Sequence, residues 1–100
     1  PVSLMFNAVS WDDVQGQVLS EMPFDSFFAP VRLGLTTWFH TGTALAKHMA
    51  QHGGGTILGI TANAGRQPVG GVGGFGVACA AVEHYLRQLA AENGPAQVGV

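Results

Sequence analysis

Apolar residues fall into short continuous runs and long helically spaced stretches, which alternate along the chain. Residues 2–6 and 56–61 are short apolar runs with little polar alternation, the pattern of strands covered on both faces in a parallel sheet. A third run of this kind begins at residue 97 and continues to 100. We predict a strand in each of these three segments.

The first long segment, residues 24–52, spaces its apolar side chains over one broad helical face. Asp25 or Ser26 is the expected N-cap, because short polar side chains satisfy the free amides of a first turn. Pro30 lacks a backbone donor and predicts either a kink or a helix that properly starts at Pro30. The glycines at 53–55 are expected to end this helix.

A second helix is expected over residues 74–91, which are rich in Ala and Leu and are followed by the stop signal Asn93-Gly94-Pro95. Residues 7–23 mix polar and isolated apolar positions, which predicts a loop at the carboxyl end of a strand. Strands that alternate with long helices favour parallel βαβ units with right-handed crossovers. The pattern therefore predicts an α/β fold, βαβαβ, with parallel strands.

Three landmarks in this order resemble the short-chain dehydrogenase/reductase (SDR) family. Residues 55–65 read GTILGITANAG, similar to the family's central strand, Gly-x-Ile-Val-x-Ile-Ser-Ser-x-x-Gly. Residues 75–83 read FGVACAAVE and residues 89–95 read LAAENGP, similar to Tyr-x-x-x-Lys-Ala-Ala-Val-Glu and the Leu-Ala-x-Glu-x-Gly-Pro that follows it. Residues 6–9, FNAV, resemble the Asn-Asn-Ala-Gly element after the fourth strand.

The resemblance implies a three-layer Rossmann-like fold, of which residues 1–100 are the central-to-C-terminal part. The family uses NAD or NADP, held by a glycine-rich loop that would lie upstream of the first strand here. The chain alone is therefore expected to bind no cofactor, or to bind it poorly. It starts at Pro1 and both of its ends lie in strand-like runs, which suggests a piece of a longer polypeptide.

The resemblance also places the family's catalytic positions, and all three are substituted. In the family, a serine steadies the substrate oxygen, a tyrosine is the general acid or base, and a lysine lowers the tyrosine pKa and holds the nicotinamide ribose. The equivalent residues are Ala62, Phe75 and Cys79. Alanine has no hydroxyl group, phenylalanine has no acidic proton, and the neutral thiol of cysteine is no cation. The family's helical asparagine, which can support a proton relay, falls near Leu33.

Asn7 and Ala8 are the cofactor-binding positions implied by the resemblance. A strand-end asparagine can also cap its own turn, and this alternative is favoured for Asn7 taken by itself.

Two motifs suggest chemistry that their context does not support. Residues 71–76 match G-x-G-x-x-G, but no strand immediately precedes them, so an active-site loop is favoured over a dinucleotide site. His48 and His52 share a helix face, with His40 as a conceivable third metal ligand, but histidines near a helix C-terminus also favour its negative end. No metal site is predicted.

Two reactive side chains in the second helix have simpler interpretations. Tyr85, which has Leu89 four residues on where a catalytic dyad would need lysine, is expected to be a packing residue. Cys79 has alanines around it and is expected to be a small buried apolar residue with an unreactive thiol.

Composition narrows the possible partners. The chain is 47% hydrophobic and only 10% charged, against about 25% charged in typical globular domains. Such a chain is expected to be either the interior part of a larger fold or a protomer that covers much of its surface against a partner. The two long helices, which build dimers in the family, predict a homo-oligomer. A net charge of −2 without a basic run argues against nucleic acid. No run of about 20 apolar residues suggests a membrane span, and the single cysteine favours the cytoplasm.

Two functions from different classes remain open. The chain is either a divergent SDR-type NAD(P)-dependent oxidoreductase, or a piece of one, with impaired chemistry, or a non-catalytic pseudoenzyme module retained for association or small-molecule binding. Reduction by a different residue set is a third alternative, which needs a cofactor loop from elsewhere.

Overall fold

A computed structural model describes residues 2–100 as a parallel three-stranded sheet with two long helices. The strands are β1 (Leu4–Asn7), β2 (Gly55–Gly59) and β3 (Val98–Gly99), and the long helices are α1 (Phe24–Gln51) and α2 (Phe75–Asn93). Three short 3-10 helices, η1 (Leu19–Glu21), η2 (Asn63–Gly65) and η3 (Gly94–Ala96), lie in the connections. The predicted α/β, βαβαβ fold with parallel strands is confirmed.

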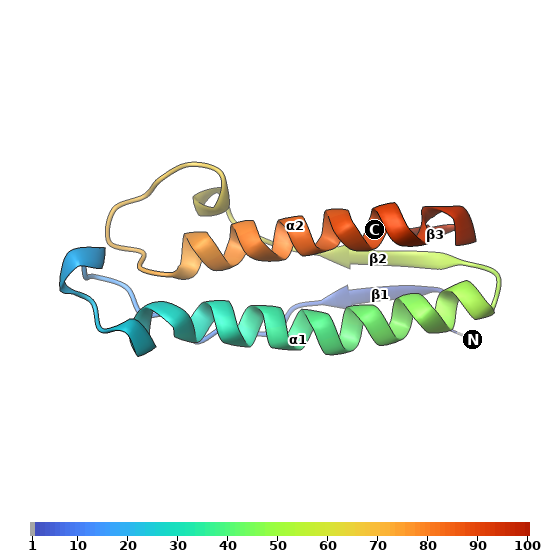
Figure 1. Ribbon diagram of the computed structural model, residues 1–100, viewed down its shortest axis with the longest axis horizontal. Coiled ribbons are helices and arrows are strands. Elements are labelled where there is room, and N and C mark those ends of the chain that lie inside the picture. Colours follow the sequence, from blue (N-terminus) through green and yellow to red (C-terminus); the bar gives the residue numbers. More distant parts are fainter. Residues whose placement is uncertain (1) are drawn as a thin grey trace.

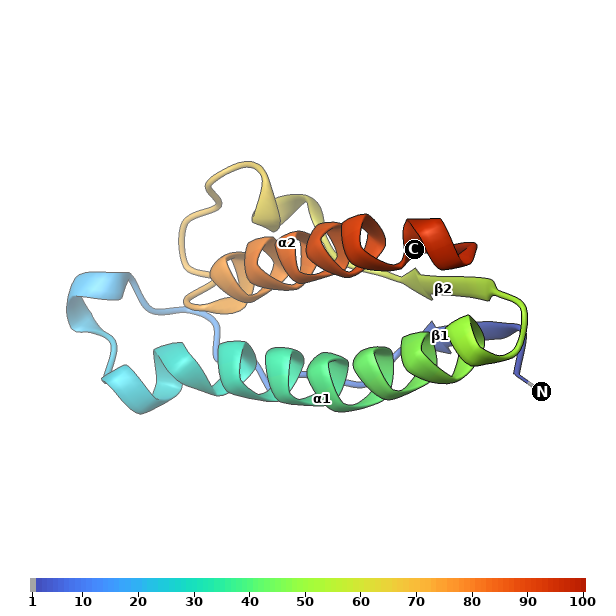
Figure 2. The ribbon, with the colours of Figure 1, turned by 45° about the vertical axis from the view of Figure 1, so that its right-hand side comes forward.

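Both crossovers lie on the same side of the sheet. The strand order is β1-β2-β3, with Leu4 opposite Thr56 in one ladder and Gly55 opposite Val98 in the other. Because parallel crossovers are right-handed, consecutive strands added in one direction place their helices on one face. Figures 1 and 2 show α1 and α2 side by side over the sheet. Residues 2–100 thus supply two of the three layers of a Rossmann-like fold.

The opposite face of the sheet is open in this part of the chain. Leu4 and Phe6 are each 58% exposed, and Leu58, their neighbour on β2, is also exposed. The expectation that strands 2–6 and 56–61 are covered on both faces is therefore wrong for residues 2–100, since both helices pack on one side. The radius of gyration of 15.0 Å exceeds the roughly 13 Å expected of a compact domain of this length, as suits a two-layer slab.

The core lies between the helices and the covered face of the sheet. Its largest fully buried side chains come from every layer, since Trp38 and Met49 belong to α1, Val82 to α2, Ile57 to β2 and Val98 to β3. Small residues let the layers approach closely. Gly59 on β2 is one of them, because a Cβ there would lie 2.5 Å from the Trp38 ring.

The start of α1 differs from the sequence prediction. Pro23 is the N-cap, no side chain caps the helix, and Asp25 and Ser26 lie within the first turn. The helix continues through Pro30, which is buried, so a start at Pro30 is wrong. A proline in the second turn loses only one amide bond, and burial of its ring compensates part of that loss.

The ends of the other elements differ by a few residues. The strand predicted at 56–61 ends at Gly59 because its partner β1 ends at Asn7 opposite it. The third strand is limited to Val98–Gly99, since Gln97 adopts a left-handed conformation with φ 63°. The predicted end of α1 is confirmed, as Gly53 and Gly54 have positive φ and the Gly54 amide donates to the Met49 carbonyl at 2.7 Å.

Candidate active site

A pocket of about 260 Å³ lies beyond the carboxyl ends of β1 and β2. Parallel α/β sheets bind their ligands at this edge. The pocket is lined by residues from the loop after β1, the segment after β2 and the first turn of α2: Val9, Ser10, Trp11, Asp13, Ile60, Thr61, Ala62 and Phe75. It is the natural position for chemistry in this fold.

Ala62 and Phe75 meet in this pocket, as the resemblance implied. Ala62 lies three residues after the end of β2, and Phe75 is the first residue of α2. Cys79 is one helical turn beyond Phe75, and its thiol is within reach of the backbone of Ala62. The fold therefore brings the three positions together without a hydroxyl, a phenol or an amine on any of them.

The Cys79 thiol is fully buried. Burial raises its pKa above the ordinary value of 9.0, and the nearby carboxylates of Glu83 and Asp13 act in the same direction. The backbone of Ala62 opposes these effects only in part. The thiol is therefore neutral at pH 7, without the thiolate character that reactive cysteines need.

Trp11 closes the other side of the pocket and was not singled out by the sequence. Its ring lies 5.9 Å from the Phe75 ring at 48° and is buried against α1, where a Cβ on Gly34 would approach it to 3.1 Å. Leu33, the position assigned to the family's helical asparagine, is instead exposed and does not line this pocket. The sequence signal that could have identified Trp11 was its position as a single tryptophan in a polar loop.

Asn7 is occupied by its own turn. Its Oδ1 accepts a hydrogen bond from the Val9 amide at 3.1 Å, and its Nδ2 donates to Thr41 Oγ1 at 3.3 Å. The side chain is buried while Ala8 beside it is exposed. This geometry agrees with the turn role, and a cofactor contact at either residue stays a prediction.

A hydrogen-bonded network lies behind the pocket. Thr61 Oγ1 donates to Glu83 Oε2 at 2.6 Å, and Arg66 Nε donates to Glu83 Oε1 at 3.2 Å. The Thr61 hydrogen bond, followed by Arg66, lowers the pKa of Glu83 below its ordinary value of 4.5, although partial burial opposes them. The network ties the end of β2 to α2. No spacing pattern in the sequence indicated it, because Thr61 and Glu83 are 22 residues apart and lie on different elements.

Replacing Glu83 with glutamine should lower the free energy of unfolding by about 1.5 kcal/mol at pH 7, since Glu83 accepts two hydrogen bonds as a carboxylate but Arg66 is largely exposed. A lowered folded-state pKa means that this stability is present above about pH 4.5 and is lost as the pH falls further. The free energies of unfolding of the parent chain and the Glu83→Gln variant, measured with urea, should therefore become equal at acid pH. Glu92→Gln, on an exposed part of the same helix, is the control, and an equal loss there would contradict the prediction.

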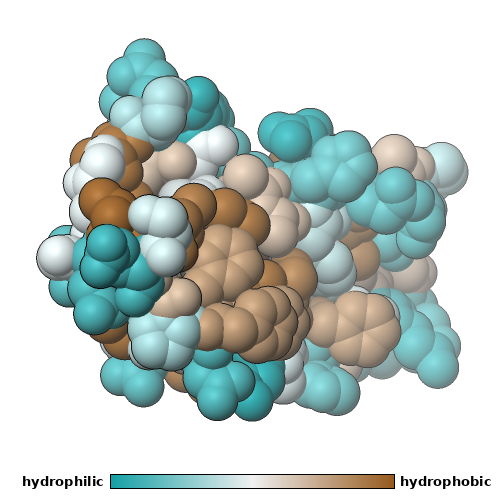
Figure 3. All heavy atoms as spheres, turned by 60° about the vertical axis from the view of Figure 1, so that its left-hand side comes forward, coloured by the Kyte–Doolittle hydropathy of each residue, from teal (hydrophilic) through white to brown (hydrophobic). Residues whose placement is uncertain are grey.

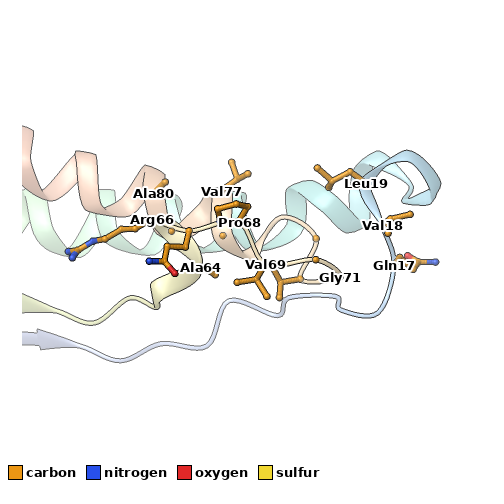
Figure 4. Close-up of a pocket in the computed structure, with 16 residues that line it drawn as sticks. Gln17, Val18, Leu19, Ala64, Arg66, Pro68, Val69, Gly71, Val77 and Ala80 are labelled. Atoms are coloured by element: carbon orange, nitrogen blue, oxygen red, sulfur yellow. The ribbon is translucent and has the colours of Figure 1, made fainter.

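A second, larger pocket of about 560 Å³ lies between η1 and the glycine-rich loop before α2. In Figure 4, Val69 and Val77 line it from one side, Val18 and Leu19 from the other, and Arg66 points away. Figure 3 shows the hydrophobic side chains that gather at this end of the molecule, where Val18, Leu19 and Val69 are exposed.

The G-x-G-x-x-G match at 71–76 belongs to this loop. The stretch does not follow β2 directly, because η2 and a turn intervene. The loop is attached to the opposite segment by the Gly16 amide, which donates to the Gly71 carbonyl at 2.7 Å. Gly74 lies against the Phe27 carbonyl, where a Cβ would clash at 1.9 Å. These contacts give the glycines a packing role.

The remaining candidate groups have structural surroundings. His48 and His52 stack at 4.1 Å at the end of α1, and within residues 2–100 no three His, Cys, Asp or Glu side chains cluster as metal ligands would. Tyr85 packs on Trp38, and its hydroxyl pairs with Thr43 at 2.8 Å, away from the pocket. None of the described helices is long and apolar enough to cross a membrane.

The residues of the smaller pocket do not fit a whole dinucleotide. The cavity of about 260 Å³ is below the usual range of roughly 300–1,000 Å³ for ligand sites. No cation lines it among the described residues, and Phe75 and Cys79 offer no phenol or amine to a ribose.

The family model described as "short chain dehydrogenase" matches residues 1–100. None of the curated proteins compared shows a significant match.

Solved structures of similar fold agree with the match to this family model. A 7α-hydroxysteroid dehydrogenase complexed with NADH and 7-oxo glycochenodeoxycholic acid is 25% identical, with a TM-score of 0.78 over 98% of this chain and 38% of its own. A putative β-ketoacyl-ACP reductase is 25% identical, with a TM-score of 0.86 over 97% and 40%. An NAD⁺-bound xylitol dehydrogenase, 18% identical, shares the fold with a TM-score of 0.89 over 97% and 37%. The chain thus spans about two fifths of the length of these structures.

Proposed function

Because the chain belongs to the short-chain dehydrogenase family, we propose that it is a divergent NAD(P)-dependent oxidoreductase of this family, or a piece of one, and that the chemistry of the chain itself is impaired. The observation that carries this proposal is the meeting of Ala62 and Phe75 in one pocket, with Cys79 buried beside them. We propose that the position of the site is retained and that its reactive groups have been replaced.

The chemistry of the family needs a proton donor near the carbonyl oxygen and a cation that tunes this donor. A phenylalanine ring has no exchangeable proton, and the neutral thiol of Cys79 provides no positive charge. The similar 7α-hydroxysteroid dehydrogenase is complexed with NADH, which supports NAD or NADP as the cofactor of the parent family. For residues 1–100 alone we propose weak cofactor binding or none.

The alternative is a pseudoenzyme module that acts by association. Exposed apolar side chains on both long helices favour it, since Phe39 on α1 and Val77 on α2 are about half exposed. Apolar area of this kind on neighbouring helices is typical of surfaces that a second subunit covers. We propose a cytoplasmic homo-oligomer that uses these helices.

Titration with NADH and NADPH, followed by cofactor fluorescence and melting temperature, tests the oxidoreductase proposal. We expect no saturable binding to the chain and none to the triple variant Ala62→Ser, Phe75→Tyr, Cys79→Lys, which should also fail to oxidise NADPH with a panel of ketones. The reason is that restored catalytic groups do not create a pyrophosphate site. The 7α-hydroxysteroid dehydrogenase is the positive control. Turnover by the triple variant would contradict the proposal.

Sedimentation equilibrium tests the association proposal. The chain should sediment as an oligomer, and a Phe39→Ser, Val77→Ser double variant should shift it toward monomer with its helical circular dichroism unchanged, because neither side chain belongs to the core. A Ser26→Ala variant outside the exposed apolar set is the control. A monomeric parent chain would reject the association role.

A further inference from the structure

The pocket at the carboxyl ends of β1 and β2 differs in charge from one built to polarise a carbonyl group. Of the described residues that line it, Asp13 is the one that carries a charge at pH 7. The other polar groups on the lining side chains are the hydroxyls of Ser10 and Thr61 and the indole N–H of Trp11. A pocket with one carboxylate and no cation attracts positive charge and repels oxyanions.

Asp13 is partly buried and belongs to the pocket wall. The charge of its carboxylate contributes to raising the pKa of the fully buried Cys79 thiol. Gln15 Nε2 donates to its Oδ2 at 2.6 Å, and within residues 2–100 no hydrogen bond is formed to its Oδ1. That oxygen can accept from a ligand.

The aromatic rings of Trp11 and Phe75 form the apolar part of the same pocket. Their centroids are 5.9 Å apart at 48°, so the two rings form an open angle. Tryptophan and phenylalanine faces attract cations within about 6 Å of the ring, and they also accept apolar groups. Thr61 gives its proton to Glu83 and so presents only acceptor capacity to the pocket.

We propose that this pocket binds a small primary amine, protonated at neutral pH and carrying a compact apolar body. Its ammonium group lies against the Asp13 carboxylate, with the oxygens of Ser10 and Thr61 as further acceptors. Its apolar body lies against Trp11 and Phe75. The volume of about 260 Å³ limits the ligand to one ring or a short chain.

This proposal rests on the described pocket and does not depend on cofactor binding. Amine binding is measured without NAD or NADP, so its failure leaves the family-based proposal standing. Conversely, a cofactor titration that contradicts the oxidoreductase proposal leaves the amine result unchanged.

Isothermal titration calorimetry of the full chain with benzylamine at pH 7 tests it, with benzyl alcohol and benzoate as probes of similar shape. Benzylamine should bind saturably, at least about tenfold more tightly than benzyl alcohol, as expected when a charge-assisted hydrogen bond replaces a neutral one. Asp13→Asn should weaken benzylamine binding by about tenfold and leave benzyl alcohol unchanged. Asp12→Asn is the matched control, because it removes the same charge from an exposed neighbour whose left-handed backbone, φ 57°, asparagine also tolerates.

Equal binding of benzylamine and benzyl alcohol, or equal losses in the two variants, would overturn the proposal. Absence of saturable benzylamine binding would do the same. If Asp13→Asn does not fold, the comparison of amine, alcohol and carboxylate on the parent chain still tests whether the pocket prefers a cation, and a failure of benzylamine to bind most tightly of the three overturns the proposal.

Discussion

Trp38→Ala is expected to lower the free energy of unfolding by about 3–5 kcal/mol, the usual cost of removing a buried aromatic side chain. Trp38 is 1% exposed and lies where all layers meet, against Gly59 of β2 and the Tyr85 ring of α2. Domains of this size have about 5–15 kcal/mol of stability in total, so this one change removes a large share of it. Urea denaturation followed by far-ultraviolet circular dichroism measures the loss.

Phe24→Ala on the same helix is the control for this experiment. Phe24 is 68% exposed and contacts mainly the neighbouring Phe27 and Phe28 rings, so its removal should cost less than about 1 kcal/mol. Similar losses at the two positions would mean that the helices are not held together through Trp38.

Gly74→Ala should have the second-largest effect, a loss of about 3 kcal/mol at the upper end of the cost of overpacking. A Cβ at this position would lie 1.9 Å from the Phe27 carbonyl oxygen, and a backbone atom cannot move aside as a flexible side chain can. The start of α2 would have to shift away from α1, and with it Phe75 in the pocket wall. Thermal unfolding measures the loss, and the fluorescence of Trp11, which packs on Phe75, should change with it.

Gly70→Ala is the control in the same loop. No atom lies within 4 Å of a Cβ built there, and its φ is not positive. The methyl group should therefore leave stability unchanged or raise it by up to about 1 kcal/mol through the unfolded chain. If Gly70→Ala destabilised the protein as much as Gly74→Ala, loop stiffness and not the contact with Phe27 would be the cause.

The alternation of apolar runs was sufficient to predict the parallel βαβαβ order, because strand and helix periods differ strongly. Exact ends were not predictable from the same pattern. The sequence around Thr61 has strong strand character, yet the strand ends at Gly59 because pairing depends on β1, a partner distant in sequence. The N-cap prediction at Asp25 or Ser26 did not anticipate that Pro23, with its fixed extended geometry, precedes the first turn.

The candidate site was predictable in part, through motif positions. Ala62, Phe75 and Cys79 were singled out by the resemblance to the family, and the fold brings the three residues close to one another. Trp11 and Asp13 were missed, since a polar loop without periodicity gives no indication of which side chains turn inward. Only the course of the chain between β1 and α1 places these two side chains in the pocket wall.

Within residues 2–100, the open face and the covered face of the sheet carry separate sets of side chains. Leu4, Phe6 and Leu58 point away from the helices, whereas Ile57 and Val98 are buried beneath them, because successive strand residues alternate between faces. Polar residues that favour strands, such as threonine, can thus replace the outward side chains without altering core packing. Within residues 2–100, such replacements make one surface of the sheet more polar and leave the pocket and the helix contacts on the other side as they are.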